Sequence, residues 1–222
     1  MRGSAGPLDL LREGLARLAV PDPDRAFSLL EAFLAELERW NPRFGLVKHD
    51  GVEELVVKHV LDSLSAWVAV RDSLASPGGT VLDVGSGAGF PGIPLAVVLP
   101  GAGFTLLERM TRRAAFLRTC GVLLGLHELR VLACDLSEAR DSFDVVTFRA
   151  VAPLDRFLSD IESSGVQWRT IISWKGRLGR ARREIDEARR GREGLYSMEA
   201  RPLSTPFLDE ERCMILVSRL LD

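Results

Sequence analysis

The segment Gly85–Gly89 reads GSGAG and directly follows the apolar run Thr80–Val84. Glycine has no Cβ atom, so a ligand can approach such a segment closely. The alternation of glycines predicts a tight turn that leaves its backbone amides free. A buried strand, a glycine-rich turn and a helix in this order are typical of α/β proteins that bind nucleotides. This segment is therefore the first candidate binding site.

Two carboxylates accompany the glycine segment. Asp83 lies at the end of the predicted strand, where it could hold an ammonium group directly or through water, and where it would repel a pyrophosphate. Glu108 closes the next apolar run about 20 residues further on, where such sheets place the carboxylate that binds ribose hydroxyls. Residues 87–92 also fit the dinucleotide pattern GxGxxG. Asp83 and the GxGxG spacing nevertheless favour S-adenosylmethionine over NAD, and the two acids make a turn without any ligand less favoured.

The elements that must position these residues alternate along the chain from residue 80 onwards. Strands are predicted at 80–84, 104–107, 129–133, 143–148, 169–173, 199–203 and 213–219, and helices at 92–99, 111–124, 154–161 and 180–190. This rhythm predicts an α/β, Rossmann-like fold with a mostly parallel sheet and helices on both faces.

The first 75 residues show helical periodicity instead. Apolar residues recur at helical spacing within 8–18, 27–40 and 52–70, with Asn41-Pro42 expected to end the second helix. The sequence SPGG at 76–79 marks a boundary. We therefore predict an N-terminal helical extension over 1–75 and a Rossmann-like domain over 76–222.

The composition is that of an ordinary globular protein. The 222 residues are 46% hydrophobic and 27% charged with a net charge of −2, which excludes a uniformly basic nucleic-acid binder but leaves room for a local basic face. The three cysteines are scattered and indicate neither a disulfide framework nor a zinc site. Residues 84–107 carry no charge but contain six glycines and three prolines, which favours a buried core over a membrane span. We expect a cytoplasmic protein without a membrane segment.

Several segments resemble the bacterial RsmG family, also called GidB. Its members transfer a methyl group from S-adenosylmethionine to N7 of a guanine in small-subunit ribosomal RNA, which gives 7-methylguanosine. The most specific matches are GFPGIP at 89–94 and KHVLDS at 58–63. Shorter ones are RWN at 39–41, FTLLE at 104–108, Arg113 with FLR at 116–118, RA at 149–150 and KG at 175–176. The resemblance runs from about residue 39 to the C-terminus and implies the class I methyltransferase fold.

The resemblance also implies cofactor contacts. The family uses the first glycine of the motif, the apolar residue that closes the glycine segment, a pair after the third strand and the arginine of the RA segment. The third-strand pair is usually a small residue followed by Glu, whereas this chain has Asp135-Leu136. Together with the residue-based arguments, the candidate cofactor-binding residues are Asp83, Gly85, Ser86, Gly87, Gly89, Phe90, Glu108, Asp135, Leu136 and Arg149.

Methylation at guanine N7 needs no general base, because N7 carries an in-plane lone pair. The enzyme mainly has to align N7, the methyl group and the sulfur. The tetrapeptide (N/D)PP(Y/F) of exocyclic-amine methyltransferases does not occur, and no cysteine has the neighbouring proline of carbon-5 pyrimidine methyltransferases. We assign no catalytic residue.

Basic side chains near the predicted strand ends are candidates for binding RNA phosphates. They are Arg112, Arg113, Arg118, Arg149, Lys175 and Arg212. A solvated helix face is the alternative for the first three, and a salt bridge to Asp144 or Asp155 is the alternative for Arg149. The arginine-rich stretch 177–192 contains interleaved acids, which favours an ordinary exposed helix over an RNA contact.

Within KHVLDS, the side chains of His59, Asp62 and Ser63 share one helix face. Hydrogen bonds that pack this helix against the glycine segment are favoured over a catalytic role. Because no histidine has a cluster of carboxylates or cysteines around it, we predict no metal site.

The leading prediction is an RNA guanine-N7 methyltransferase that acts, as a monomer, on small-subunit ribosomal RNA or on a subunit assembly intermediate. A small-molecule methyltransferase with the helical extension as a lid is the first alternative. An NAD-dependent oxidoreductase and a non-catalytic nucleotide-binding regulator are further alternatives.

Overall fold

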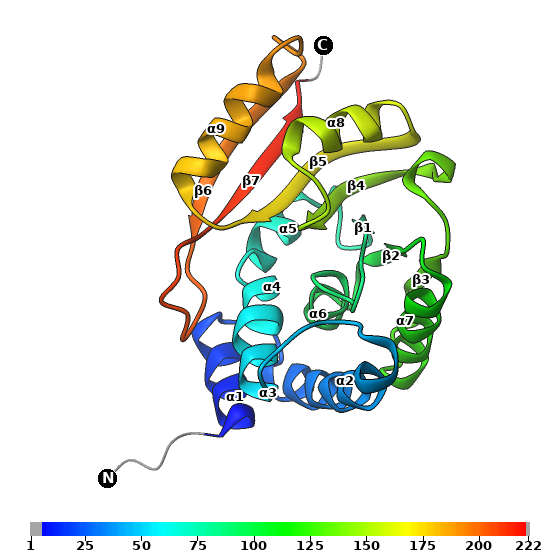
Figure 1. Cartoon of the computed structure of the whole chain (residues 1–222), viewed down its shortest axis with the longest axis vertical. Helices are drawn as coiled ribbons and strands as arrows, with labels where there is room; N and C mark the ends of the chain where they lie inside the picture. The colour runs from blue at the N-terminus through cyan, green and yellow to red at the C-terminus, as the bar shows by residue number, and fades with distance from the viewer. Residues whose placement is uncertain (1–5, 221–222) are drawn as a thin grey trace.

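A computed structural model describes residues 6–220 of the chain. Within that range seven strands form one sheet in the order β3-β2-β1-β4-β5-β7-β6 (Figure 1). The strands are β1 Thr80–Val84, β2 Gly103–Leu107, β3 Leu129–Leu132, β4 Arg140–Arg149, β5 Gly165–Lys175, β6 Tyr196–Leu203 and β7 Arg212–Arg219. Strands β1 to β5 run parallel, whereas β7 is antiparallel to both β5 and β6. The predicted α/β, mostly parallel architecture is confirmed.

The centre of the sheet is β1, which lies between β2 and β4. Val84 at its end pairs with Leu107 of β2 on one side and with Phe148 of β4 on the other. The chain fills the sheet outward from β1 to β3 and then crosses back to β4. This reversal of strand order beside β1 creates the place where open α/β sheets bind their ligands, at the carboxyl ends of the strands.

Helices cover both faces of the sheet (Figure 1). The helical segments are α1 Pro7–Arg17, α2 Pro23–Phe44, α3 Val52–Glu54, the π-helix η1 Leu55–Leu61, α4 Asp62–Leu64, α5 Trp67–Ser73, α6 Gly92–Val98, α7 Thr111–Leu123, the 3-10 helix η2 Leu136–Glu138, α8 Leu154–Glu162 and α9 Leu178–Arg189. One face packs against α6, α7 and the helices of the first 73 residues, and the other face packs against α8 and α9.

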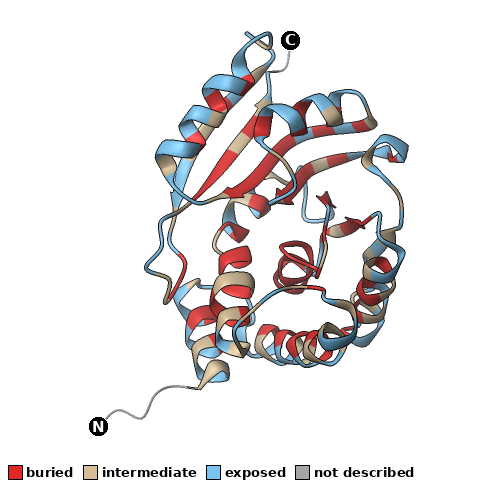
Figure 2. Cartoon of the chain, viewed as in Figure 1, coloured by how far each residue is buried: buried red, intermediate tan, exposed pale blue. Residues whose placement is uncertain are grey.

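Each face has its own apolar core, and the buried residues concentrate between the helices and the sheet (Figure 2). Leu11 and Phe33 of the N-terminal helices belong to the same buried cluster as Val81 and Phe104 of the sheet. The boundary expected at 76–79 does fall between α5 and β1. The division into an extension over 1–75 and a domain over 76–222 stays a prediction.

Two expectations about the N-terminal helices are wrong. Helix α2 continues through Pro42 to Phe44, because Gly45 rather than the proline ends it, with a φ of 57° and its amide bonded to the carbonyl of Asn41. The helix expected over 52–70 is divided among α3, η1, α4 and α5. A π-helical turn inside an α-helix is rare and often accompanies functional sites.

The uncharged run 84–107 is divided between the end of β1, the glycine segment, α6 and β2. Among the described residues, no helix combines the length and the apolar character needed to cross a membrane.

Candidate functional site

The glycine segment 85–89 leaves the end of β1 at the centre of the sheet. Gly85, Gly87 and Gly89 have φ values of +70°, +56° and +94°, which residues with a Cβ atom rarely adopt. A Cβ atom on Gly85 would lie 2.7 Å from a methyl group of Val151, which follows β4. The segment therefore turns in a conformation that its glycines permit, and Gly85 is exposed.

Most amides of this segment are not free, so that expectation is wrong. The amides of Gly85 and Ser86 donate to the carbonyl of Leu107 over 2.8 and 3.1 Å, and Gly89 donates to the carbonyl of Ser86 over 2.7 Å. The amide of Gly87 donates to Oε2 of Glu108 over 3.0 Å. Leu107, the last residue of β2, and Glu108, which follows it, thus accept from three of these amides.

Glu108 is buried at the end of β2 and holds two backbone amides. Besides Gly87, the amide of Met110 donates to its Oε1 over 2.8 Å. An ionised carboxylate offers about four lone-pair positions, so each oxygen can still accept a hydroxyl. The position and the spare acceptor capacity suit the predicted contact with a ribose.

Asp83 is completely buried and joins three elements. Its Oδ2 accepts from the amide of Gly92 at the start of α6 over 3.2 Å, and its Oδ1 accepts from the hydroxyl of Thr147 in β4 over 2.9 Å. Burial raises its pKa from 3.8 to about 6, against the lowering effect of the hydrogen bonds that it accepts. The geometry gives Asp83 a scaffolding role that sequence patterns did not predict; its contact with an ammonium group stays a prediction.

Arg149 projects from the end of β4 beside the glycine segment. Its Nη1 lies 3.0 Å from Oδ2 of Asp62, its Nη2 lies 3.0 Å from Nδ1 of His59, and its guanidinium lies 5.5 Å from the centre of the Phe90 ring. Burial lowers the pKa of Arg149, and the charge of Asp62 opposes that effect. The salt bridges considered for Arg149 are not formed. Asp144 accepts from the amide of Thr80 and lies 4.0 Å from Arg169, and Asp155 pairs with Arg192.

The KHVLDS segment meets the glycine segment differently from the prediction. The contact is between two rings, His59 and Phe90, whose centres lie 5.2 Å apart. The hydroxyl of Ser63 donates to the carbonyl of His59, within its own helix. Burial, followed by the nearby charge of Arg149, lowers the pKa of His59 from 6.5 to about 4, so this imidazole is neutral.

The remaining candidates lie along the same edge of the sheet but in different surroundings. Asp135 caps η2 after β3 and accepts from the amide of Ser137, which lowers its pKa, and Leu136 is half-buried beside it. Lys175 lies 2.6 Å from Glu184 of α9.

At the start of α7, Arg112 is exposed and Arg113 is half-buried, and Arg118 donates to the carbonyl of Val131 over 3.4 Å. Arg212 pairs with Asp62 and Glu210. Among residues 6–220, Arg149 and Arg212 are the only two of the six basic candidates that pair with the same acid, which is Asp62.

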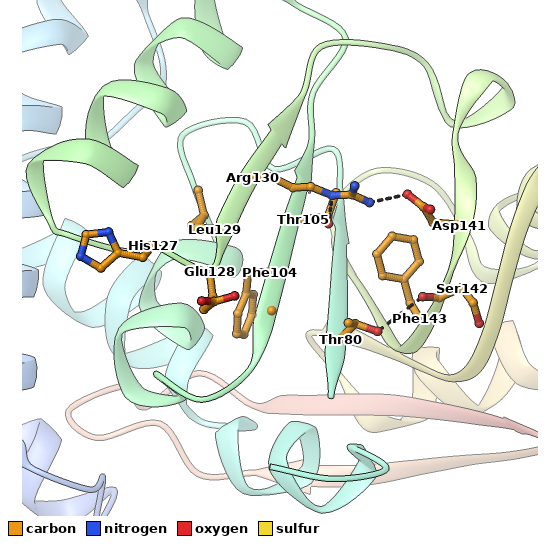
Figure 3. A pocket seen from close by; sticks show the side chains of 11 residues that line it. Thr80, Phe104, Thr105, His127, Glu128, Leu129, Arg130, Asp141, Ser142 and Phe143 are labelled. Carbon is orange, nitrogen blue, oxygen red and sulfur yellow. Dashed lines mark hydrogen bonds and ion pairs between the residues drawn. The ribbon is translucent and has the colours of Figure 1, made fainter. Parts of the chain in front are cut away.

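The opposite edge of the sheet has a hollow of about 430 Å³ (Figure 3). It is lined by residues at the beginnings of the strands, such as Thr80, Phe104 and Phe143, and Arg130 crosses it to Thr105 and Asp141. None of the predicted site residues lines this hollow. In the part of the chain that the structure describes, no group of three or more His, Cys, Asp or Glu side chains could hold a metal ion.

Comparison with known proteins gives a consistent result. The model of the family described as rRNA small subunit methyltransferase G matches residues 26–215. The ribosomal RNA small subunit methyltransferase G of Treponema pallidum is 36% identical over 219 residues, which covers 94% of this chain and 92% of that protein. The protein of the same name from Neisseria gonorrhoeae is 33% identical over 215 residues, with coverage of 94% and 97%.

Solved structures resemble this fold at low sequence identity. The human methyltransferase 10 domain containing protein gives a TM-score of 0.56 at 15% identity, with 86% of this chain and 97% of that chain covered. Magnesium protoporphyrin IX methyltransferase from Synechocystis gives 0.52 at 19% identity, with coverage of 84% and 94%. These similarities concern the fold.

Proposed function

The chain belongs to the rRNA small subunit methyltransferase G family, and on that premise we propose that it transfers a methyl group from S-adenosylmethionine to N7 of a guanine in small-subunit ribosomal RNA. The observation that carries the proposal is the family match over residues 26–215, together with relatives that align along nearly their whole length. Family membership favours this reaction over the small-molecule, NAD-dependent and purely regulatory alternatives.

The residues at the ends of β1, β2 and β4 fit S-adenosylmethionine, which supplies an electrophilic methyl group on a sulfonium. Glu108 would accept hydrogen bonds from the ribose hydroxyls with its remaining lone pairs. Gly85 is exposed directly after β1, and the guanidinium of Arg149, at the end of the neighbouring strand β4, lies over the ring of Phe90. Ser86, Gly87 and Gly89 form the turn. Asp83 would attract the ammonium group of the ligand electrostatically from its buried position near the end of β1. Asp135 and Leu136 would border the site from β3.

On the RNA side, Arg112, Arg113 and Arg118 would bind phosphates, because they lie on α7, the helix that follows β2, and form no ion pair with a carboxylate among residues 6–220. Lys175 and Arg212 would do so after exchanging an acid partner for a phosphate. No general base is needed at N7, so the chain's contribution is alignment.

We further propose that the protein acts in the cytoplasm as a monomer, on free small-subunit ribosomal RNA or on a subunit assembly intermediate. The two substrates are distinguished by measuring methyl transfer to each of them with the same preparation of the protein.

The test incubates the protein with radiolabelled S-adenosylmethionine and small-subunit ribosomal RNA from cells that lack the enzyme. Borohydride–aniline treatment, which cleaves at 7-methylguanosine, then maps the product. We expect label in the RNA and a single cleavage site. Label in RNA that resists cleavage would contradict methylation at N7, and absence of label from both the free RNA and the assembly intermediate would contradict an RNA substrate.

A further inference from the structure

Asp62 is a buried carboxylate that the proposed reaction does not use. It follows the π-helix η1, and its two oxygens face two arginines from different strands. Oδ2 lies 3.0 Å from Nη1 of Arg149 at the end of β4, and Oδ1 lies 3.1 Å from Nε of Arg212 at the start of β7. The hydroxyl of Thr205 donates to Oδ1 over 3.4 Å. One carboxylate thus connects a cofactor-binding candidate with an RNA-binding candidate.

The backbone of Asp62 is also held in place. Its carbonyl accepts from the indole nitrogen of Trp174, at the end of β5, over 2.9 Å, and from the hydroxyl of Ser65 over 2.7 Å. Contacts from β4, β5, β7 and the loop before β7 therefore fix the direction of this carboxylate. A side chain that is locked by such contacts can in turn lock its partners.

Arg149 depends on Asp62 for its opposing charge. Among residues 6–220, Asp62 is the only acid within 4.0 Å of its guanidinium, which is mostly buried. The other contacts of Arg149 are neutral: Nδ1 of His59, the carbonyl of Lys58 at 3.4 Å and the face of Phe90. Removing one partner of a buried ion pair leaves the other charge uncompensated, so it moves toward water.

Arg212 continues the chain of charges to the surface. It pairs with Glu210 at 3.0 Å, Glu210 lies 3.5 Å from Lys58, and Lys58 lies 3.1 Å from Glu54. Acids and bases alternate along this path, which begins at Asp62 and ends at Glu54 in the same helical segment. The arrangement ties the start of β7 to the helix that carries Asp62.

We propose that Asp62 is a positioning residue: its carboxylate orients Arg149 toward a cofactor bound beside the glycine segment and holds Arg212 next to the same site. This inference rests on the proposed function only in taking S-adenosylmethionine as the ligand beside Arg149.

The test replaces Asp62 by asparagine, which keeps the shape of the side chain. Because both carboxylate oxygens face N–H donors, the new amide group must point its own N–H toward one guanidinium. We expect the Kd for S-adenosylmethionine, measured calorimetrically without RNA, to rise on the order of tenfold, as for other residues that orient a binding group. In an Arg149→Gln background the same substitution should change Kd by less than about twofold, because Asp62 acts through Arg149.

A second measurement uses the protein without any ligand. In the wild type, NMR titration should place the pKa of His59 at about 4, because burial and the adjacent Arg149 both disfavour protonation. If Asp62→Asn releases Arg149 from the His59 ring, this pKa rises toward 6.5. If Arg149 stays in place, the pKa does not rise, and the positioning role is refuted.

The matched control is Asp144→Asn. Asp144 is also a largely buried acid, and its Oδ2 accepts from the amide of Thr80 over 2.9 Å, but it lies at the opposite edge of the sheet. This variant should lose stability while the Kd for S-adenosylmethionine and the pKa of His59 stay unchanged. Equal effects of both substitutions on Kd would reduce Asp62 to a general stability role and overturn the inference.

Should Asp62→Asn fail to fold, the double variant Asp62→Asn/Arg212→Gln takes its place, because it removes one charge of each sign. Its Kd for S-adenosylmethionine is compared with that of Arg212→Gln alone. An unchanged Kd between these two variants also overturns the inference. Failure of the proposed function gives a different pattern: the wild type would bind S-adenosylmethionine without methylating RNA, or would not bind it, while the His59 titration still reports on Asp62.

Discussion

The carboxylate of Glu108 accepts a hydrogen bond from the amide of Gly87 over 3.0 Å, so the end of β2 holds the middle of the glycine segment that follows β1. The two residues are 21 positions apart in the chain and meet because β1 and β2 are parallel neighbours. The residue predicted to bind a ribose therefore also shapes the turn beside it.

Glu108→Gln should weaken both functions of this carboxylate. The side-chain amide must turn an N–H toward the backbone amide of Gly87 or of Met110, which leaves a partly buried donor without an acceptor. We expect a loss of about 1–3 kcal/mol in the free energy of unfolding and weaker binding of S-adenosylmethionine in calorimetry. As a control, Glu162→Gln alters an exposed acid of α8 that pairs with Arg192, and it should lower stability without changing cofactor affinity. Unchanged affinity in the Glu108 variant would remove this residue from the site.

Gly92→Ala should destabilise the protein. A Cβ atom at this position would collide with the side chain of Leu106 and lie 2.7 Å from Oδ2 of Asp83. Overpacking of a buried site costs about 1–3 kcal/mol, measured by urea denaturation. Gly179→Ala in α9 is the contrasting variant, because no heavy atom lies within 4 Å of the added carbon. There we expect a gain of about 0.5–1 kcal/mol from helix propensity. Equal stability of the two variants would contradict the packing argument.

Asp83 should give stability an unusual dependence on pH. Its pKa is raised to about 6 in the folded protein, against 3.8 for the ordinary group, so the folded state binds this proton more tightly than the unfolded state. The contribution of Asp83 to the free energy of unfolding therefore falls as pH rises from about 4 to about 6, by on the order of 3 kcal/mol.

The variant Asp83→Asn has no such titration. Its amide can accept from Gly92 and donate to Thr147, whose hydroxyl can reverse its role. The stability of the variant relative to the wild type should rise between pH 4 and pH 7 in parallel urea titrations. A pH-independent difference would show that Asp83 ionises normally.

Arg113→Ala should weaken RNA binding in a way that depends on salt. If Arg113 neutralises a phosphate, its loss lowers the slope of log K against log salt by about 0.7–1. Filter binding between low and moderate salt measures that slope. Arg169→Ala removes an exposed arginine of β5 that lies near Asp144, away from the ligand edge, and should leave the slope unchanged. The same slope for the wild type and both variants would exclude Arg113 from the RNA interface.

The sequence by itself determined the fold and the place of the candidate site residues within it. The apolar runs at 80–84 and 104–107 predicted β1 and β2, because a central parallel strand must be apolar on both faces. The spacing of Gly85–Gly89 and Glu108 placed both at the carboxyl ends of adjacent strands, since parallel strands end at the same edge. Local pattern suffices for such features.

Only the tertiary structure decided which polar groups meet. Asp62 is 87 residues from Arg149 and 150 from Arg212, and Thr147 is 64 residues from Asp83. The local sign of the last contact is a single threonine, Thr147, among the apolar residues 145–148 of β4. The acceptors that occupy the glycine amides and the π-helical turn before Asp62 also have no pattern of their own. They depend on how helices dock onto the sheet, which is set by packing across the whole core rather than by neighbouring residues in the chain.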